Sequence, residues 1–149
     1  MNKKDFVSKT FVTNSFKETQ KLGRDFAKSL RAGDVVCLYG DLGSGKTTFV
    51  QGLAKGLGIK NRIISPTFVI VRSYKLGVMG FCHIDLYRIE NKRGLEGLGI
   101  EEIINNPQNI IVIEWAEKLK SNCPQKRIDI EFFYEKNNVR KIKFRPLNQ

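Results

Sequence analysis

The sequence predicts a three-layer α/β fold, with a mostly parallel central sheet between helices and added antiparallel strands at the C-terminus. Two unbroken apolar runs, Val35–Tyr39 and Ile110–Ile113, are typical of strands buried on both faces of a parallel sheet. An amphipathic helical pattern follows the first run. From Arg127 to Phe132 the tail instead alternates apolar and charged residues, which is the period of an antiparallel strand.

The chain has 149 residues, of which 41% are hydrophobic, so a single domain over residues 1–149 is expected. No apolar stretch approaches the roughly 18 residues of a membrane-spanning helix, and the N-terminus lacks the apolar core of a signal peptide. We therefore expect a cytoplasmic protein without a membrane partner. Its three cysteines lack CxxC spacing, which favours reduced, idle thiols, and its only histidine, His83, argues against a zinc site.

The composition is strongly basic. Lys and Arg total 26 against 15 Asp and Glu, giving a net charge of +11. Such an excess can serve RNA, an acidic partner or solubility. Because the basic residues are spread along the chain rather than concentrated in one block, a solvated surface is favoured over direct contact with nucleic acid.

The first predicted elements are a strand and a helix. Apolar residues from Phe6 to Val12 predict the strand. Ser15 and Glu18 have the spacing of a helix capping box, so a helix is expected to follow. Gly33, which tolerates a left-handed backbone, is placed to end that helix.

A strand, a glycine-rich loop and a second helix are predicted next. The run Val35–Tyr39 leads directly into Gly40–Thr48. The apolar stripe of the following helix continues to Leu57, and Gly56 and Gly58 supply its C-terminal stop.

The middle of the chain predicts a hairpin and a short helix. Phe68–Tyr74 and Phe81–Leu86 are β-rich runs, and the two glycines within Lys75–Gly80 suit a turn between them. A helix is expected from Leu95 to Ile104, although three glycines weaken it and Pro107 closes it.

The last predicted elements are a buried strand, a helical turn and a hairpin. The strand Ile110–Glu114 ends on a carboxylate, and a short helical turn is expected over Ala116–Lys120. A turn at Lys136–Asn138 then separates the alternating run from a final strand over Val139–Arg145, which predicts a closing antiparallel hairpin.

The segment Gly40–Thr47 matches the phosphate-loop pattern GxxxxGK(S/T). Its glycines let successive backbone N–H groups form an anion nest at the positive end of the following helix. Lys46 is expected to reach the β- and γ-phosphates, and Thr47 to offer its hydroxyl to Mg²⁺. The other loop residues expected to hold the nucleotide, mainly through backbone donors, are Asp41, Leu42, Gly43, Ser44, Gly45 and Thr48.

Two acids are candidates for ordering Mg²⁺ or the attacking water, because Asp85 and Glu114 each emerge from an apolar run. A capping or salt-bridged role is the alternative for both. Thr67 lies where a switch threonine would sense a γ-phosphate, although Ser-Pro-Thr is also an ordinary turn sequence. His83 shares a strand face with Asp85 and is assigned a supporting role. Trp115 is interpreted as a core residue in preference to a lid on the nucleotide.

Four motifs in register resemble the TsaE (YjeE) family, bacterial ATPases required to make threonylcarbamoyladenosine in tRNA. They are GDLGSGKTT at residues 40–48, SPTF at 65–68, HIDLYR at 83–88 and IEWAEK at 113–118. The resemblance covers essentially the whole chain. It departs from the family at Ser44, where many members carry alanine, and at Ala116, where some carry proline; neither change removes a charge or a backbone donor.

The resemblance implies a P-loop NTPase-like fold, ATP and Mg²⁺ as cofactors, and hydrolysis that is slow alone. It also implies action with the TsaB and TsaD proteins, with tRNA reached only through that complex. For the phosphate loop, the resemblance implies that Lys46 and Thr47 hold phosphate and magnesium. It implies that Thr67 is the switch threonine and that Trp115 lies near the nucleotide. Of the two acids, it implies that Asp85 serves metal or catalysis and that Glu114 orders metal-bound water.

Other functions stay open on the sequence. A small-molecule kinase would need a lid for which 149 residues leave little room. A GTP-dependent switch would carry an NKxD motif, whereas residues 91–94 read NKRG. An RNA-associated ATPase is the third alternative. A stimulating arginine could come from a partner or from within the chain, where Arg72, Arg88 and Arg93 are the candidates.

Overall fold

The computed structural model describes residues 2–63 and 70–147, which form a mixed α/β fold around a seven-stranded sheet. The strands are β1 (Thr10–Thr13), β2 (Val35–Tyr39), β3 (Val71–Leu76), β4 (Met79–Asp85), β5 (Asn109–Glu114), β6 (Ile128–Tyr134) and β7 (Arg140–Phe144). The helices are η1 (Lys3–Asp5), α1 (Phe16–Ala27), α2 (Lys46–Gly56), α3 (Lys92–Glu96), α4 (Ile100–Ile104) and η2 (Ala116–Asn122). None of the helices in these residues combines the length and apolar composition that a bilayer-spanning segment needs.

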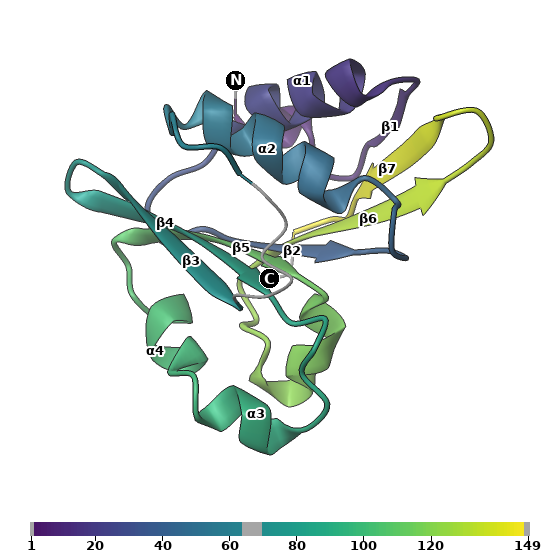
Figure 1. Cartoon of the computed structure of the whole chain (residues 1–149). Coiled ribbons are helices and arrows are strands. Elements are labelled where there is room, and N and C mark those ends of the chain that lie inside the picture. The colour runs from purple at the N-terminus through teal and green to yellow at the C-terminus, as the bar shows by residue number, and fades with distance from the viewer. Residues whose placement is uncertain (1, 64–69, 148–149) are drawn as a thin grey trace.

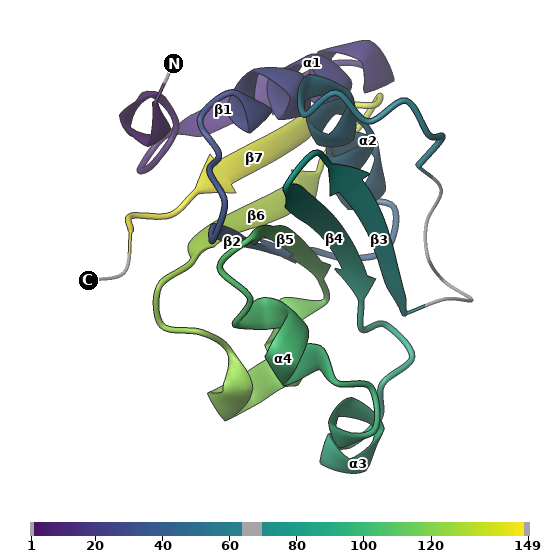
Figure 2. The same cartoon turned by 90° about the vertical axis from the view of Figure 1, so that its left-hand side faces the viewer.

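The strand order is β1-β7-β6-β2-β5-β4-β3, as Figure 2 shows. The four central strands β6, β2, β5 and β4 are parallel, which confirms a parallel core where the apolar runs lie. The C-terminal hairpin of β6 and β7 is also confirmed. Antiparallel pairing occurs at both edges of the sheet, however, because β3 pairs with β4 and β1 pairs with β7. The sequence pattern did not reveal that β6 would also join the parallel core beside β2.

Helices cover both faces of the sheet, with α1 and α2 on one face and α3, α4 and η2 on the other (Figure 1). Alternate residues of β2 supply the two cores, because successive side chains of a strand point to opposite faces. Val36 and Leu38 pack toward α1 and α2, whereas Val35 and Cys37 pack toward the short helices. All four side chains are buried.

Helices α1 and α2 approach each other closely through glycines. A Cβ atom at Gly52 would lie 1.9 Å from the carbonyl oxygen of Gln20, and one at Gly23 would lie 2.2 Å from that of Phe49. Only a residue without a side chain fits such a backbone contact.

Gly52→Ala is therefore expected to lower the free energy of unfolding by about 2 kcal/mol, since overpacking a tight contact outweighs the helix propensity of alanine. Urea denaturation measures this change. Gly94→Ala, in α3, is the matched control, because its Cβ would approach the Ile89 side chain no closer than 3.4 Å. A Gly52→Ala protein as stable as the Gly94→Ala protein would show that the two helices separate without cost.

Two N-terminal boundaries differ from the sequence prediction. The first strand begins at Thr10 rather than Phe6, because Lys3–Asp5 form a helical turn capped by the side chain of Asn2. Helix α1 ends at Ala27, well before Gly33, and the hydroxyl of Ser29 donates to the carbonyl of Phe26, 2.7 Å away. Such local side-chain bonds compete with helix continuation.

Two boundaries in the middle of the chain also differ. The turn between β3 and β4 contains only Gly77 and Val78, and Gly77 has a φ of +65°. The predicted helix from Leu95 to Ile104 is divided into α3 and α4, because Gly99 adopts a left-handed backbone between them. The part of the predicted strand Phe68–Tyr74 before residue 70 lies outside the described residues.

Candidate nucleotide-binding site

The glycine loop, residues 40–45, joins the end of β2 to the start of α2. Gly40, Gly43 and Gly45 adopt positive φ values of 148°, 80° and 108°, which let the chain turn tightly. Gly45 is the N-cap of α2, and no side chain that the structure describes caps this end of the helix. The partial positive charge of the α2 N-terminus therefore faces the loop without a built-in anion.

Parallel register brings both candidate acids to the same edge of the sheet. Leu38, near the end of β2, pairs with Glu114 on β5, and Glu114 pairs with Asp85 on β4. The carboxyl ends of the three strands therefore meet beside the glycine loop, as expected for a binding site in an open α/β sheet.

The Glu114 carboxylate is buried and held by two neighbours. The hydroxyl of Thr47 donates to its Oε1 at 3.1 Å, and its Oε2 lies 2.5 Å from Nε2 of His83. His83 is itself fully buried. The sequence assigned His83 a supporting role, and this contact specifies it: the imidazole fixes the orientation of the Glu114 carboxylate.

The buried Lys46 ammonium makes its direct contacts with groups that carry no negative charge. It donates to the carbonyl of Gly40 and lies 3.9 Å from the centroid of the Trp115 ring. Burial lowers the pKa of Lys46, while the Glu114 carboxylate opposes that shift. Lys46 therefore places a positive charge at the glycine loop. Because its direct contacts are neutral, this charge can still pair with an anion.

Trp115 forms part of the wall of this site. It adopts a left-handed backbone with a φ of 61°, and its ring lies 5.1 Å from that of Tyr87. Its half-buried side chain also packs against the core on the η2 face. The interpretation of Trp115 as a core residue is therefore incomplete, because one part of the side chain is packed and another lines the site.

Asp85 is buried and accepts the N–H of Tyr87 at 3.0 Å. Burial raises the pKa of Asp85; the Tyr87 hydrogen bond opposes this shift, and the nearby Glu114 adds to it. One oxygen of the carboxylate thus stabilises the turn after β4. This is the capping role that the sequence analysis gave as the alternative for Asp85.

Asp85→Asn is expected to raise the free energy of unfolding at neutral pH, because an amide keeps the acceptor for Tyr87 without a buried charge. The pKa of Asp85 is higher in the folded state, so its contribution to stability is full below the unfolded pKa and is lost as pH rises through the folded one. The gain should therefore be present at pH 7 and vanish well below about pH 4. Denaturant unfolding at pH 7 and at a pH well below about 4 measures this gain in stability. Glu96→Gln, at an exposed position, is the control. An equal gain at acid pH would show that the charge of the Asp85 carboxylate is not its cause.

These groups line one cavity of about 470 Å³, which lies within the usual size range of ligand pockets. The predicted binding residues that line it are Leu42, Gly43, Gly45, Lys46, Thr47, Thr48, Asp85, Glu114 and Trp115. Of the other loop residues, Asp41 is exposed and Ser44 is buried, and the Ser44 hydroxyl has no hydrogen-bond partner within the described part of the chain.

Arg140 also lines the cavity, although it was not among the binding residues expected from the sequence. Its guanidinium carbon lies 5.1 Å from the centroid of the Phe16 ring, and its buried Nε has no hydrogen-bond partner among residues 2–63 and 70–147. Among the described residues, the arginines considered from sequence, Arg72, Arg88 and Arg93, do not line the cavity. Arg140 belongs to no recognisable motif, so only the pairing of β7 with β6 reveals its position.

The model of the family described as "Threonylcarbamoyl adenosine biosynthesis protein TsaE" matches residues 13–142. The chain belongs to the TsaE family. A Bacillus subtilis (strain 168) relative, the tRNA threonylcarbamoyladenosine biosynthesis protein TsaE, is 39% identical over 85% of this chain and 78% of its own length. The Nostoc relative of the same name is 38% identical over 97% and 89%, respectively. The crystal structure of Bacillus subtilis YdiB superposes with a TM-score of 0.77 and 33% identity, covering 91% of this chain and 83% of that one.

The match to the TsaE family includes every residue that lines the cavity, Arg140 among them. It also includes Thr67, the predicted switch threonine, which lies outside the residues that the structure describes, as does the rest of the SPTF motif at 65–68. The role of Thr67 in this TsaE-family chain therefore stays a prediction.

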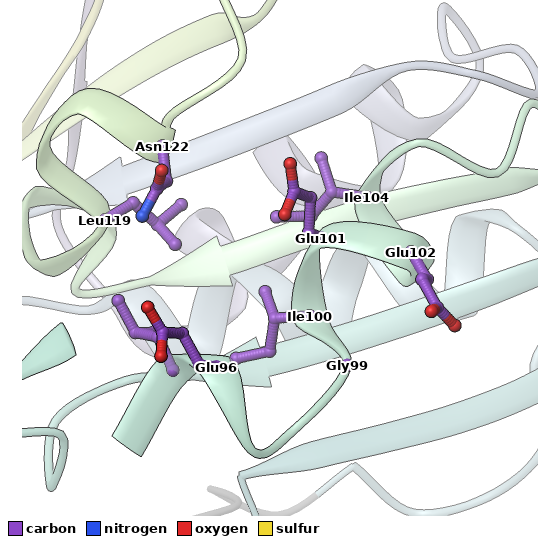
Figure 3. Close-up of a pocket in the computed structure, with 9 residues that line it drawn as sticks. Glu96, Gly99, Ile100, Glu101, Glu102, Ile104, Leu119 and Asn122 are labelled. Carbon is purple, nitrogen blue, oxygen red and sulfur yellow. The ribbon is translucent and has the colours of Figure 1, made fainter. Parts of the chain in front are cut away.

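A second hollow in the TsaE-family chain lies between α3, α4 and η2 (Figure 3). Its volume is about 200 Å³, and Ile100, Ile104 and Leu119 supply apolar side chains to it. Three glutamates, Glu96, Glu101 and Glu102, also line it. These charges repel a polyanion, so the cavity at the glycine loop is the better candidate for a nucleotide.

Proposed function

We propose that this TsaE-family chain binds Mg·ATP at the glycine loop and hydrolyses it in support of threonylcarbamoyladenosine formation in tRNA. The observation that carries the proposal is the convergence of Lys46, Thr47 and Glu114 in one cavity at the carboxyl edge of the parallel strands. A buried strand, a glycine loop and a helix in this order are the context that a phosphate-loop motif requires, which favours a P-loop NTPase-like fold.

Phosphate binding rests on the loop backbone and on Lys46. The uncapped N-terminus of α2 and the three glycines with positive φ provide an anion nest. Lys46 would exchange its contact with the Gly40 carbonyl for phosphate oxygens, and this charge-assisted interaction is stronger than the neutral one it replaces. Binding of a polyanion would also offset the cost of burying the ammonium.

The donor set fits a magnesium ion. Thr47 contributes a hydroxyl and Glu114 a carboxylate, and their oxygens are 3.1 Å apart. Hard oxygen ligands of this kind suit Mg²⁺, which usually keeps several waters and binds nucleotide phosphates. When bound there, the ion would neutralise charge on the phosphates.

Glu114 is the residue we assign to ordering the attacking water, because His83 and Thr47 fix its carboxylate at the cavity wall. Asp85 is adjacent across the strand pair, but one of its oxygens already accepts the Tyr87 N–H. It would serve the metal or its water through the other oxygen. A carboxylate held in one orientation positions water more effectively than a mobile one.

Arg140 and Phe16 form another part of the cavity lining. Phe16 is 59% exposed, and its ring lies beside the Arg140 guanidinium, so both offer flat surfaces on which a base can stack. The buried, unpaired Nε of Arg140 also gives the site a second cationic donor besides Lys46. We therefore propose that the nucleoside end of ATP lies against Arg140 and Phe16.

The partner proteins are proposed from the family resemblance and from the rim of the cavity. Leu42 in the glycine loop is 74% exposed, and it lines the same cavity as the exposed Phe16. Apolar side chains exposed around a polar site are typical of a surface that a partner covers. We assign that surface to the TsaB and TsaD proteins, with tRNA reached through their complex.

Reconstitution tests this function. ATP turnover and threonylcarbamoyladenosine content of tRNA are measured with TsaB and TsaD, with and without this chain as the only variable. The expected result is slow turnover by the chain alone, faster turnover with the partners, and modified tRNA only in the complete mixture. Full modification without the chain would contradict the proposal, and tight binding of tRNA by the chain alone would favour an RNA-associated ATPase.

A further inference from the structure

Two cysteines that are far apart in the sequence, one on β2 and one just after η2, have their side chains in contact. Cys37 is on β2, three residues before Gly40, and Cys123 follows the end of η2. Their sulfur atoms are 3.9 Å apart. The third cysteine, Cys82, is on β4 and its nearest polar partner is the hydroxyl of Ser73.

The two thiols differ in accessibility and in acidity. Cys37 is fully buried, whereas Cys123 is partly exposed. The hydrogen bond from Cys37 lowers the pKa of Cys123 to about 7, with Arg127 acting in the same direction against burial. The same contact, together with burial, raises the pKa of Cys37. Cys123 is therefore both the more acidic and the more accessible of the two thiols.

We infer that Cys37 and Cys123 are a reversible disulfide pair whose oxidation by a hydroperoxide displaces η2 and with it Trp115. In the first step the Cys123 thiol loses its proton and its sulfur attacks the hydroxyl oxygen of the hydroperoxide. The O–O bond breaks, the sulfur becomes a sulfenic acid, and the leaving alkoxide takes up a proton to balance the one that the thiol lost and is released as an alcohol. In the second step the Cys37 sulfur attacks that sulfur and loses its proton, and the hydroxyl leaves as water. Two thiols are oxidised to one disulfide, and one hydroperoxide is reduced to alcohol and water.

The bond requires the sulfurs to move from 3.9 Å to about 2.05 Å. Strand β2 is held on both sides by β5 and β6, so Cys37 resists displacement. Cys123 is attached to a less regular segment, because Lys120 has non-helical backbone angles of 49° and −122° within η2. The movement is therefore expected in η2.

Movement of η2 would reach the glycine-loop cavity through Trp115. This residue is the N-cap of η2, and its ring contacts the Lys46 ammonium at 3.9 Å. Trp115 is also the only tryptophan of the chain, so its fluorescence reports on this contact without any nucleotide. The inference consequently does not rest on the proposed ATPase activity, and its failure would leave that activity untouched.

The experiment treats the reduced full-length chain with hydrogen peroxide and counts free thiols after denaturation. We expect loss of two of the three thiols without dimer formation, a peptide linking Cys37 to Cys123, a shift in Trp115 emission, and reversal of all three by dithiothreitol. Cys82→Ser is the matched control and should behave as the wild type. Cys123→Ser, at the partly exposed position, should form no intramolecular bond and show no emission shift.

Cys37→Ala gives a second check of the first step, because Cys123 should then accumulate as a sulfenic acid that a carbon nucleophile such as dimedone traps. Three surviving thiols in the wild type, or linkage only between two chains, would overturn the pair. A correctly formed bond that leaves the Trp115 emission unchanged would overturn the displacement of η2.

Discussion

Replacing Lys46 with alanine is expected to weaken ATP binding by about 30-fold or more. The ammonium is buried beside a neutral carbonyl and an aromatic ring, so the alanine variant leaves bound phosphates without their nearest cation. Losing one partner of a buried charged contact costs about 2–5 kcal/mol, and each 1.4 kcal/mol is a factor of ten in affinity. Isothermal titration calorimetry with ATP and Mg²⁺ measures the change.

Lys55→Ala is the matched control for this experiment. Lys55 lies on the same helix, α2, but is exposed and does not line the cavity. Its replacement lowers the net charge by the same amount and should leave the affinity within about twofold, because an exposed charge contributes little. An equal loss in both variants would mean that overall charge, and not the glycine loop, holds the nucleotide.

Glu114→Gln is expected to keep ATP binding and to lower turnover by about 100-fold or more. The amide has the shape of the carboxylate and can still accept from Thr47, so the cavity wall should persist. It has no negative charge with which to polarise or deprotonate a water, which is why the chemical step should suffer more than binding. Single-turnover hydrolysis and an ATP titration of the same preparation separate the two effects.

Glu101→Gln is the control for this variant, because Glu101 is exposed on α4 and lines the other hollow. It should hydrolyse ATP at the wild-type rate. If Glu114→Gln also turns over normally, the water-ordering role belongs to another acid. Asp85 would then be the first to test, since it pairs with Glu114 across neighbouring strands.

The fold could be predicted largely because its central elements have strong local patterns. The apolar runs Val35–Tyr39 and Ile110–Ile113 are typical of strands buried on both faces, and they lie in β2 and β5 of the structure. Predictions of boundaries failed where a local interaction competed with the pattern. The Ser29 hydroxyl, bonded to the Phe26 carbonyl, accompanies the early end of α1, and Gly99 divides the helix expected from Leu95 to Ile104.

The candidate site was predictable to the extent that its residues are neighbours in the chain. The spacing within residues 40–47 identified Lys46 and Thr47, and an acid at the end of each apolar run identified Asp85 and Glu114. The contact between His83 and Glu114 depends on the parallel register of β4 and β5, which no pattern within either strand specifies.

The sequence by itself determined the strand, loop and helix that place Lys46 at a glycine loop, because backbone conformation and hydrophobic period act over a few residues. Only the tertiary structure decided that Arg140 lies in the same cavity and that Cys37 lies beside Cys123. Both contacts join residues far apart along the chain, and they arise from the position of β6 beside β2 and from the path of η2. Strand order and packing set such distances, and neither can be read from the hydrophobic periodicity of a local segment.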